Sequence, residues 1–254
     1  MTYCVGLLLK DGLVMVADTR TNAGLDNVAT FRKLHIFERP GDRFIALATA
    51  GNLAITQSVL SLISEGLEVE ATGELRTIWT VTGMFQAAHL VGQAIREVYR
   101  IDGPSLEQQS ARFDVTMLLG GQVGRGQLRL FEVYAAGNFI EATVDTPYLQ
   151  IGEHKYGKPI LDRAAQFDTD ISDGLKLALI SMDSTMRSNL GVGMPIDIAT
   201  YERDALKSSL NYRITRDEPY FADLRNRWSE ALRQAHLAIP RPPYGEPAKP
   251  SDAD

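Results

Sequence analysis

The sequence predicts an α+β fold, specifically a four-layer αββα sandwich with two stacked sheets and helices on the outside. Two observations support this fold class. Predicted strands come in pairs joined by short turns, and predicted helices also come in pairs between groups of strands. Because helix and strand do not alternate singly, and no G-x-G-x-x-G follows the first strand, a doubly wound parallel sheet is disfavoured.

The first half of the chain contains two predicted hairpins followed by two predicted helices. Lys10-Asp11-Gly12 and Pro40-Gly41-Asp42 are the turns, and the polar segment between the hairpins reads as a loop. Asn52 is a suitable N-cap for the first helix. In the second helix, the spacing of the apolar residues predicts an inner face made of Phe85, Ala88, His89, Val91, Ala94 and Ile95. The predicted elements are strands 2–9, 13–18, 33–37 and 44–50, loop 20–32, and helices starting at 52 and spanning 82–99.

The second half repeats this order. Glycine pairs and polar turns separate three predicted strands, two helices follow, and two strands complete the core. The predicted elements are strands 114–119, 127–134 and 139–149, helices 158–167 and 173–190, and strands 196–201 and 210–215.

The domain organisation follows from these elements. Residues 1–216 form one predicted domain, and residues 217–238 form an extra C-terminal helix packed on it or on a neighbouring subunit. The proline-rich composition of residues 239–254 predicts a disordered tail. The predicted helix carries one apolar seam with 3-4-3-4 spacing: Phe221, Leu224, Trp228, Ala231 and Ala235.

Composition excludes several classes of protein. The chain has 254 residues, 44% of them hydrophobic, and a net charge of -6, which gives no basic footprint for nucleic acid. No apolar stretch is long enough for a membrane span and no signal peptide is evident. Cys4 is the one cysteine and the four histidines are scattered, so we expect no disulfide, no metal and no cofactor. These features favour a cytoplasmic protein.

Thr2 is the first candidate for catalysis. A small second residue permits removal of Met1, and the new N-terminus would then carry a nucleophilic hydroxyl and a free α-amine on one residue. A threonine activated by its own amine is a recognised covalent catalyst.

Three further residues complete a plausible site. The first hairpin returns Asp18 close to the chain start, and Lys33 begins the next predicted strand, where it could lie beside Asp18. Gly51 stands where a strand gives way to a helix N-terminus, a place with outward-facing backbone N–H groups. Taken singly, these residues are more often a turn residue, a solvated strand end and a backbone breaker.

The motifs around these residues resemble a known family. The run from Thr2 through Asp18, Lys33 and Thr49-Ala50-Gly51 is similar to the N-terminal half of proteasome β-type and HslV-type subunits, which are N-terminal-nucleophile (Ntn) hydrolases. Residues 151–158 (IGEHKYGK) and 181–190 (SMDSTMRSNL) resemble the Anbu branch, the bacterial ancestral β subunits. The similarity extends from residue 2 to about 215.

The resemblance implies a role for each candidate. Thr2 corresponds to the mature N-terminal threonine, Asp18 and Lys33 to the site's aspartate and lysine, and Gly51 to the glycine whose N–H forms the oxyanion hole. The lysine is one position nearer the threonine than in the proteasome pattern.

The second half of the chain departs from the proteasome pattern. Glu153 replaces a serine near the N-terminal amine, while Ser188 and Gly191 replace an aspartate and a serine. We expect Arg20, Glu153 and Ser188 to support the site, with groups different from those of proteasomes.

The sequence therefore predicts a self-assembling threonine peptidase or amidohydrolase that forms a homo-oligomer, either a ring or an open spiral. Its substrate would be a peptide or amide, an ATPase partner is unspecified, and neither nucleic acid nor membrane is an expected partner. Two alternatives stay open. One is a weak or inert proteasome-like scaffold, and the other is an Ntn amidase or transpeptidase acting on a non-protein amide.

Overall fold

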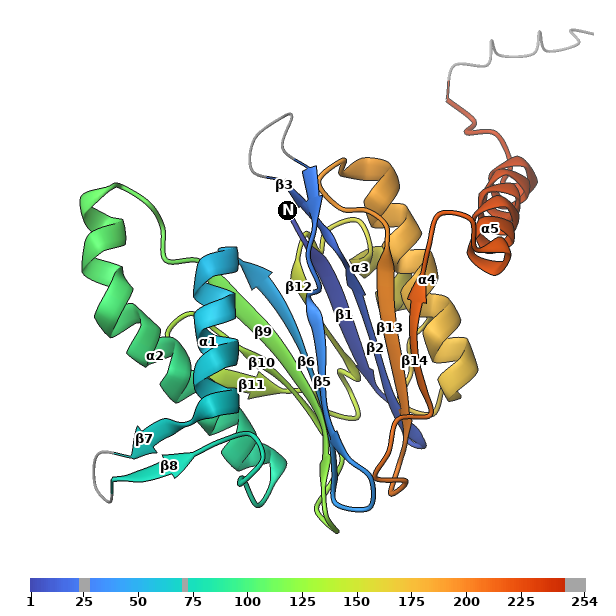
Figure 1. The fold of residues 1–254 in the computed structure, drawn as a ribbon. Helices are drawn as coiled ribbons and strands as arrows, with labels where there is room; N and C mark the ends of the chain where they lie inside the picture. Colours follow the sequence, from blue (N-terminus) through green and yellow to red (C-terminus); the bar gives the residue numbers. More distant parts are fainter. Residues whose placement is uncertain (23–27, 70–72, 245–254) are drawn as a thin grey trace, which may run out of the picture. The chain divides into compact units, whose positions relative to one another are not determined.

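Two five-stranded antiparallel sheets form the centre of the protein (Figure 1). The computed structural model describes residues 1–22, 28–69 and 73–244. The contacts divide the chain into residues 1–218 and residues 219–254, which are treated separately below. The first sheet has the order β12 (Tyr148–Gly152), β1 (Tyr3–Leu8), β2 (Gly12–Asp18), β13 (Ile196–Glu202) and β14 (Leu210–Ile214). The second has the order β11 (Phe139–Glu141), β10 (Arg129–Val133), β9 (Val115–Val123), β6 (Arg43–Gly51) and β5 (Leu34–Arg39).

The two sheets face each other across an apolar layer. Leu13 and Met15 from β2 meet Ala46 from β6 and Leu118 from β9 in this layer. Phe44 and Tyr201 stack across it with ring centroids 4.6 Å apart. Every residue of β1 and β2 is buried, because these strands are covered on both faces. Burial on both faces explains why their sequences are continuously apolar, without alternation.

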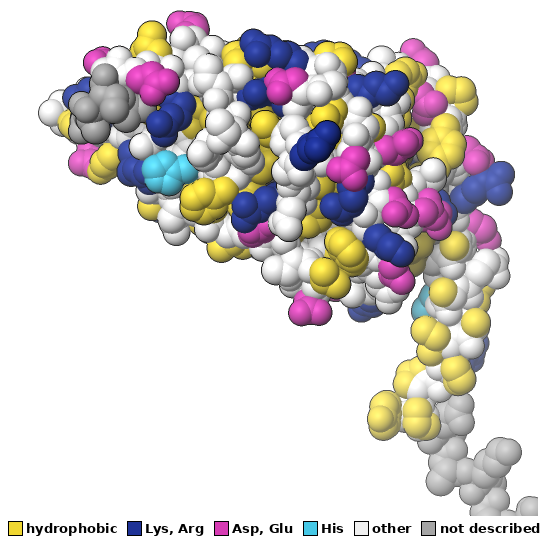
Figure 2. Space-filling model, turned by 90° about the horizontal axis from the view of Figure 1, so that it is seen from below, with side chains coloured by type: hydrophobic (Ala, Val, Ile, Leu, Met, Phe, Trp, Pro, Cys, Tyr) yellow, Lys and Arg dark blue, Asp and Glu magenta, His cyan; other side chains and the backbone are white. Residues whose placement is uncertain are grey.

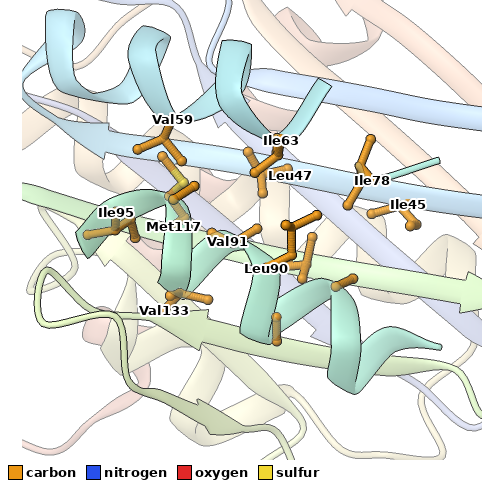
Figure 3. Packing of buried hydrophobic residues seen from close by; sticks show 14 of the residues in the cluster. Ile45, Leu47, Val59, Ile63, Ile78, Leu90, Val91, Ile95, Met117 and Val133 are labelled. Atoms are coloured by element: carbon orange, nitrogen blue, oxygen red, sulfur yellow. The ribbon is translucent and has the colours of Figure 1, made fainter. Parts of the chain in front are cut away.

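Helices α1 (Leu53–Glu65) and α2 (Met84–Gln108) pack on the other face of the second sheet. Figure 3 shows Val59, Ile63 and Val91 packed against Leu47 and Met117 of this sheet. The Asn52 side chain caps α1 by accepting a hydrogen bond from the Ala54 N–H (2.9 Å), as expected from the sequence.

Helices α3 (Lys158–Ala164) and α4 (Ile171–Ser188) lie beside each other, and α4 packs on β1 and β2 of the first sheet. The Asp170 side chain caps α4 by accepting from the Asp173 N–H. Two sheets with antiparallel pairing and segregated helices confirm the predicted α+β class.

The predicted strand 139–149 is wrong, because the chain crosses between the sheets in its middle. β11 ends at Glu141 in the second sheet, and β12 begins at Tyr148 in the first. Thr143 and Thr146 form a turn between them, and Pro147 has no N–H for a strand ladder. The carbonyl of Pro147 instead accepts from the Leu8 N–H at 2.7 Å and starts the pairing with β1.

The second helix also differs from the prediction. It continues through Pro104 to Gln108, and Met84, Ala87 and Leu90 line its buried face, whereas Phe85 and His89 are exposed. The predicted loop 20–32 contains a short hairpin of β3 (Arg20–Asn22) and β4 (Val28–Thr30), with residues 23–27 outside the described part. A second small hairpin, β7 (Leu67–Val69) and β8 (Glu74–Arg76), follows α1.

The last helix, α5, spans Pro219–Ala238. Of the predicted seam, Phe221 and Leu224 are buried and Trp228 is partly buried, but Ala231 and Ala235 are exposed. Leu232 and Leu237 are also exposed. Of the predicted tail, residues 245–254 lie outside the described part. Figure 2 shows basic and acidic side chains interspersed over the visible face of the protein.

We expect Leu47→Ala to lower the free energy of unfolding by about 2–5 kcal/mol, because a fully buried leucine leaves a cavity between β6 and the helices. Leu75→Ala on β8 is the matched control, since that leucine is 60% exposed. Urea unfolding at one fixed protein concentration measures both. Equal losses in the two variants would contradict the packing described here.

Candidate active site

A buried ion pair joins Asp18 and Lys33. Asp18 is the last residue of β2, and Lys33 directly precedes β5 in the other sheet. The Lys33 Nζ lies 2.7 Å from Asp18 Oδ1, and both side chains are almost fully buried. The sequence expectation that the lysine would lie beside the aspartate agrees with this contact.

Asp18 also accepts hydrogen bonds from three backbone N–H groups. Oδ1 accepts from Tyr3 (3.0 Å), and Oδ2 accepts from Arg20 (3.2 Å) and Gly193 (3.1 Å). These donors come from β1, from the residue after Thr19, and from the segment that leads into β13. One carboxylate therefore holds together the start of the chain, the end of β2 and a segment about 175 residues away.

Burial and hydrogen bonding act in opposite directions on the charge of Asp18. Burial raises the pKa of this carboxyl, and the Lys33 ammonium and the N–H groups of Tyr3 and Gly193 oppose that rise. Since all the named partners donate hydrogen bonds, they satisfy a carboxylate and not a carboxylic acid. We therefore treat Asp18 and Lys33 as an ionised pair.

Lys33 has two further acceptors next to the chain start. Its Nζ donates to the Arg20 carbonyl at 2.6 Å and to the Met1 carbonyl at 3.4 Å. The Met1 carbonyl carbon is bonded to the nitrogen of Thr2. The ammonium thus lies within one peptide group of the predicted nucleophile.

Thr2 is itself held in place by its backbone. The Thr2 carbonyl accepts from the Glu153 N–H at 2.7 Å, and the residue is 9% exposed. Gly152 has a φ of +80°, and a Cβ there would lie 2.1 Å from the Thr2 oxygen, so only glycine allows this approach. Met1 is 63% exposed, and its side chain lies against Gly191.

Gly51 ends β6, on the sheet that contributes Lys33. The Thr49 N–H, two residues earlier, donates to the Lys33 carbonyl at 3.0 Å. Backbone N–H groups alternate between the two edges of a strand, so the N–H of Gly51 lies on the same edge of β6 as that of Thr49. This edge faces β5, at the end of the sheet where Lys33 lies. Gly51 has a φ of +107°, and a Cβ would collide with the Asp114 carbonyl, so this position requires glycine.

Of the three residues expected to support the site, Arg20 and Glu153 contact neighbouring loops, whereas Ser188 is exposed. The Arg20 guanidinium donates to the Leu190 carbonyl (2.8 Å) and packs on Gly193. The Glu153 carboxylate accepts from the Asn189 side chain (3.0 Å). Ser188, in contrast, is exposed at the last position of α4.

Sequence reasoning missed two residues that shape the site. Asn189 links the Glu153 carboxylate to the Gly191 N–H, which donates to Asn189 Oδ1 at 2.8 Å. Gly193 supplies an N–H to Asp18. Asn189 does lie in the run 181–190 that resembles the Anbu branch, but the close spacing of Asn189, Gly191 and Gly193 by itself indicates only a helix end.

The described residues contain no group of three His, Cys, Asp or Glu side chains that could hold a metal ion. Within the same described part, none of the helices has the length and apolarity required to cross a membrane.

Comparison with characterised protein sequences gives weak but long matches to proteasome subunits. The chain is 25% identical to the probable proteasome subunit beta type-2 of Schizosaccharomyces pombe over 229 residues, covering 87% of this chain and 77% of the relative. It is 25% identical to the proteasome subunit beta of Methanococcus maripaludis strain C5 over 206 residues, covering 81% and 85%. No family model matches the chain.

Solved structures give a much closer match. Anbu from Hyphomicrobium sp. strain MC1 is 50% identical with a TM-score of 0.85, covering 94% of this chain and 98% of that one. The chain belongs to the Anbu branch of the proteasome-like family. Anbu from Yersinia bercovieri is 46% identical with a TM-score of 0.87, covering 96% and 100%. A structure described as a helical assembly of the Anbu complex from Pseudomonas aeruginosa is 44% identical with a TM-score of 0.88, with the same coverage.

Breaking the buried Asp18–Lys33 pair by removing one partner should destabilise the protein. We expect Asp18→Asn to lower the free energy of unfolding by about 3–5 kcal/mol, because Lys33 keeps a buried charge without its counter-ion. Asp173→Asn is the control, since it removes a carboxylate from an exposed pair with Lys176 and should change stability little. Urea unfolding of both variants measures the difference, and similar values would contradict a structural role for the buried pair.

Proposed function

We propose that this protein is a threonine peptidase or amidohydrolase whose nucleophile is Thr2 after removal of Met1. The two stacked sheets and their outer helices support a four-layer αββα Ntn-hydrolase arrangement for residues 1–216. The observation that carries the proposal is the position of the Lys33 ammonium. It contacts the Met1 carbonyl, next to Thr2, while paired with buried Asp18.

The first chemical step follows from this arrangement. The Thr2 hydroxyl oxygen attacks the carbonyl carbon of an amide, and its proton passes to the Thr2 α-amine. An α-amine has a reference pKa of about 7.7–8.0, so part of it is neutral near pH 7. The nearby Lys33 ammonium lowers the proton affinity of the amine and stabilises negative charge on the hydroxyl oxygen.

The remaining steps restore the enzyme. The tetrahedral intermediate collapses, the C–N bond breaks, and the leaving amine takes the proton from the α-ammonium. The resulting ester on Thr2 is attacked by water, whose proton returns through the α-amine. A carboxylic acid leaves, and the hydroxyl of Thr2 is restored.

Gly51 is the proposed oxyanion donor. Its N–H points toward the sheet end that carries Lys33, as argued above from the Thr49 hydrogen bond. A donor of this kind contributes roughly 3 kcal/mol to transition-state stabilisation in comparable sites. Arg20, Glu153 and Ser188 remain proposed supporting residues, with Glu153 the best placed because its N–H binds Thr2.

A proteasome-like scaffold with weak or no activity is the second candidate. The exposure of Ser188 and the Asn189 partner of Glu153 favour it, because these groups differ from the supporting groups implied by the proteasome resemblance. An amidase or transpeptidase acting on a non-protein amide uses the same first step and differs in the acyl acceptor or substrate.

We further propose that the chain assembles into a homo-oligomer in the cytoplasm. The helical assembly described for the Pseudomonas aeruginosa Anbu complex supports oligomerisation, and the exposed leucines of α5 offer an apolar contact surface. Whether head-to-tail contacts close into a ring or give an open spiral depends on the rotation between subunits. No ATPase partner is proposed.

The mechanism requires a free amine on Thr2. We expect intact-mass measurement of protein purified from cells to show the loss of one methionine. A β-lactone or epoxyketone probe should then add to Thr2, and Thr2→Ala should abolish both labelling and hydrolysis while the fold is kept. Lys33→Ala should also abolish labelling, whereas the exposed Lys10→Ala should not. Active, labelled protein that retains Met1 would contradict the mechanism, and unlabelled wild type lacking Met1 would favour the scaffold.

The assembly proposal is tested by light scattering. Wild-type protein should have a mass several times the 28.0 kDa of one chain. Glutamate at both Leu232 and Leu237 should reduce that mass, because it places charge on the exposed apolar side of α5. Leu75→Glu, at an exposed leucine of β8, is the control. A monomeric wild type would overturn the assembly proposal, and an unchanged mass in the double variant would exclude α5 as the contact.

A further inference from the structure

The hydroxyl of Tyr3 belongs to a buried hydrogen-bond network that has no part in the proposed threonine mechanism. Tyr3 follows the proposed nucleophile and is fully buried. Its hydroxyl lies 2.9 Å from Ser181 Oγ on α4 and accepts from the Gln150 side-chain amide on β12 at 2.5 Å. Burial raises the pKa of Tyr3, so the phenol keeps its proton.

The direction of this chain is fixed by the number of protons. Ser181 Oγ donates its single proton to the Ala178 carbonyl at 2.9 Å. Ser181 therefore accepts from Tyr3, and Tyr3 accepts from Gln150. Each of the two hydroxyls, of Tyr3 and of Ser181, therefore accepts one hydrogen bond and donates one, so all the hydrogen bonds of the network run in one direction. Such a satisfied buried network holds its members in a single geometry.

The surrounding packing prevents the phenol from moving. A Cβ on Gly157, just before α3, would lie 2.4 Å from the Tyr3 hydroxyl oxygen. The ring thus ends against the backbone of Gly157 and the side chain of Ser181. Alternation along β1 directs Tyr3 toward α4, whereas Cys4 faces the layer between the sheets.

The backbone of the same residue touches the ion pair. The Tyr3 N–H donates to Asp18 Oδ1, the oxygen that also accepts from Lys33 Nζ. The Tyr3 nitrogen is bonded to the carbonyl carbon of Thr2. A shift of the Tyr3 ring would therefore move Thr2 and Asp18 relative to Lys33.

We propose that Tyr3 is a positioning residue for Thr2, anchored by the Gln150–Tyr3–Ser181 hydrogen-bond chain. The proposal rests on the proposed function of Thr2. The hydrogen bonds to Gln150 and Ser181 hold the Tyr3 ring in place. The ring in turn holds the backbone of β1 at its first residue, and this backbone sets the distance between the Thr2 hydroxyl and Lys33. Misplacement of reacting groups by about 1 Å can reduce a rate up to about a hundredfold.

The test compares Tyr3→Phe with Tyr201→Phe. Tyr201 is a second fully buried tyrosine whose hydroxyl donates to Gln122, at the opposite end of β2. The rate of covalent labelling of Thr2 by a β-lactone is followed by intact mass at several probe concentrations. Tyr3→Phe should lower the maximal labelling rate between about tenfold and a hundredfold, with unchanged half-saturation and pH midpoint. Tyr201→Phe should leave all three unchanged.

Ser181→Ala provides an independent variant that keeps the phenol. It removes the acceptor of Tyr3 and should lower the maximal labelling rate in the same direction, with unchanged oligomeric mass. Equal rates in wild type and both site variants would overturn the positioning role. If Tyr3→Phe fails to fold, Ser181→Ala decides the question alone.

Hydrogen–deuterium exchange separates this inference from the proposed function. If the wild type is not labelled, the threonine-hydrolase proposal fails. The positioning proposal then still requires faster amide exchange in residues 2–5 of Tyr3→Phe than of Tyr201→Phe. Unchanged exchange there would overturn it.

Discussion

The buried contact between Asp18 and Lys33 is the interaction on which the rest of the site depends. A carboxylate and an ammonium removed from water need full compensation, and here it comes from three backbone N–H groups that donate to Asp18 and two carbonyls that accept from Lys33. Those groups lie around the start of β1, the end of β2 and the segment before β13, whereas Lys33 directly precedes β5 of the other sheet. The stacking of the sheets therefore determines the geometry of the pair, and the pair in turn ties down the first three residues of the chain.

The overall fold was largely predictable because its signals are local. Turn residues, apolar runs and the cap at Asn52 each indicate their own element, and most predicted elements agree with the structure. The crossing between β11 and β12 was missed, although Pro147 inside the predicted strand 139–149 already argues against one continuous strand. On α2 the predicted inner residues Ala88, Val91, Ala94 and Ile95 are buried, but Phe85 and His89 were wrongly included and are exposed.

The site was predictable only in part, for a physical reason. Asp18 and Lys33 are brought together by adjoining hairpins, so the chain order already suggests their contact. Asn189 and Gly193 lie in a loop more than 170 positions after Asp18 in the sequence. Gly193 donates its backbone N–H to Asp18, and Asn189 contacts Glu153 and Gly191 through its side-chain amide. Backbone donors leave no trace in residue type, so their role becomes visible only when the two sheets are assembled. The catalytic roles of Thr2 and Gly51 remain predictions.

The contact between Met1 and Gly191 has a practical consequence for work with this protein. The first side chain already lies against the loop that carries Asn189, and the Met1 carbonyl occupies a hydrogen bond of Lys33. Any affinity tag fused to the N-terminus would keep the Thr2 nitrogen in a peptide bond, so that it could not act as a free amine. Purification tags therefore belong at the C-terminus, and material prepared with an N-terminal fusion would report only on a form of the protein whose Thr2 amine is blocked.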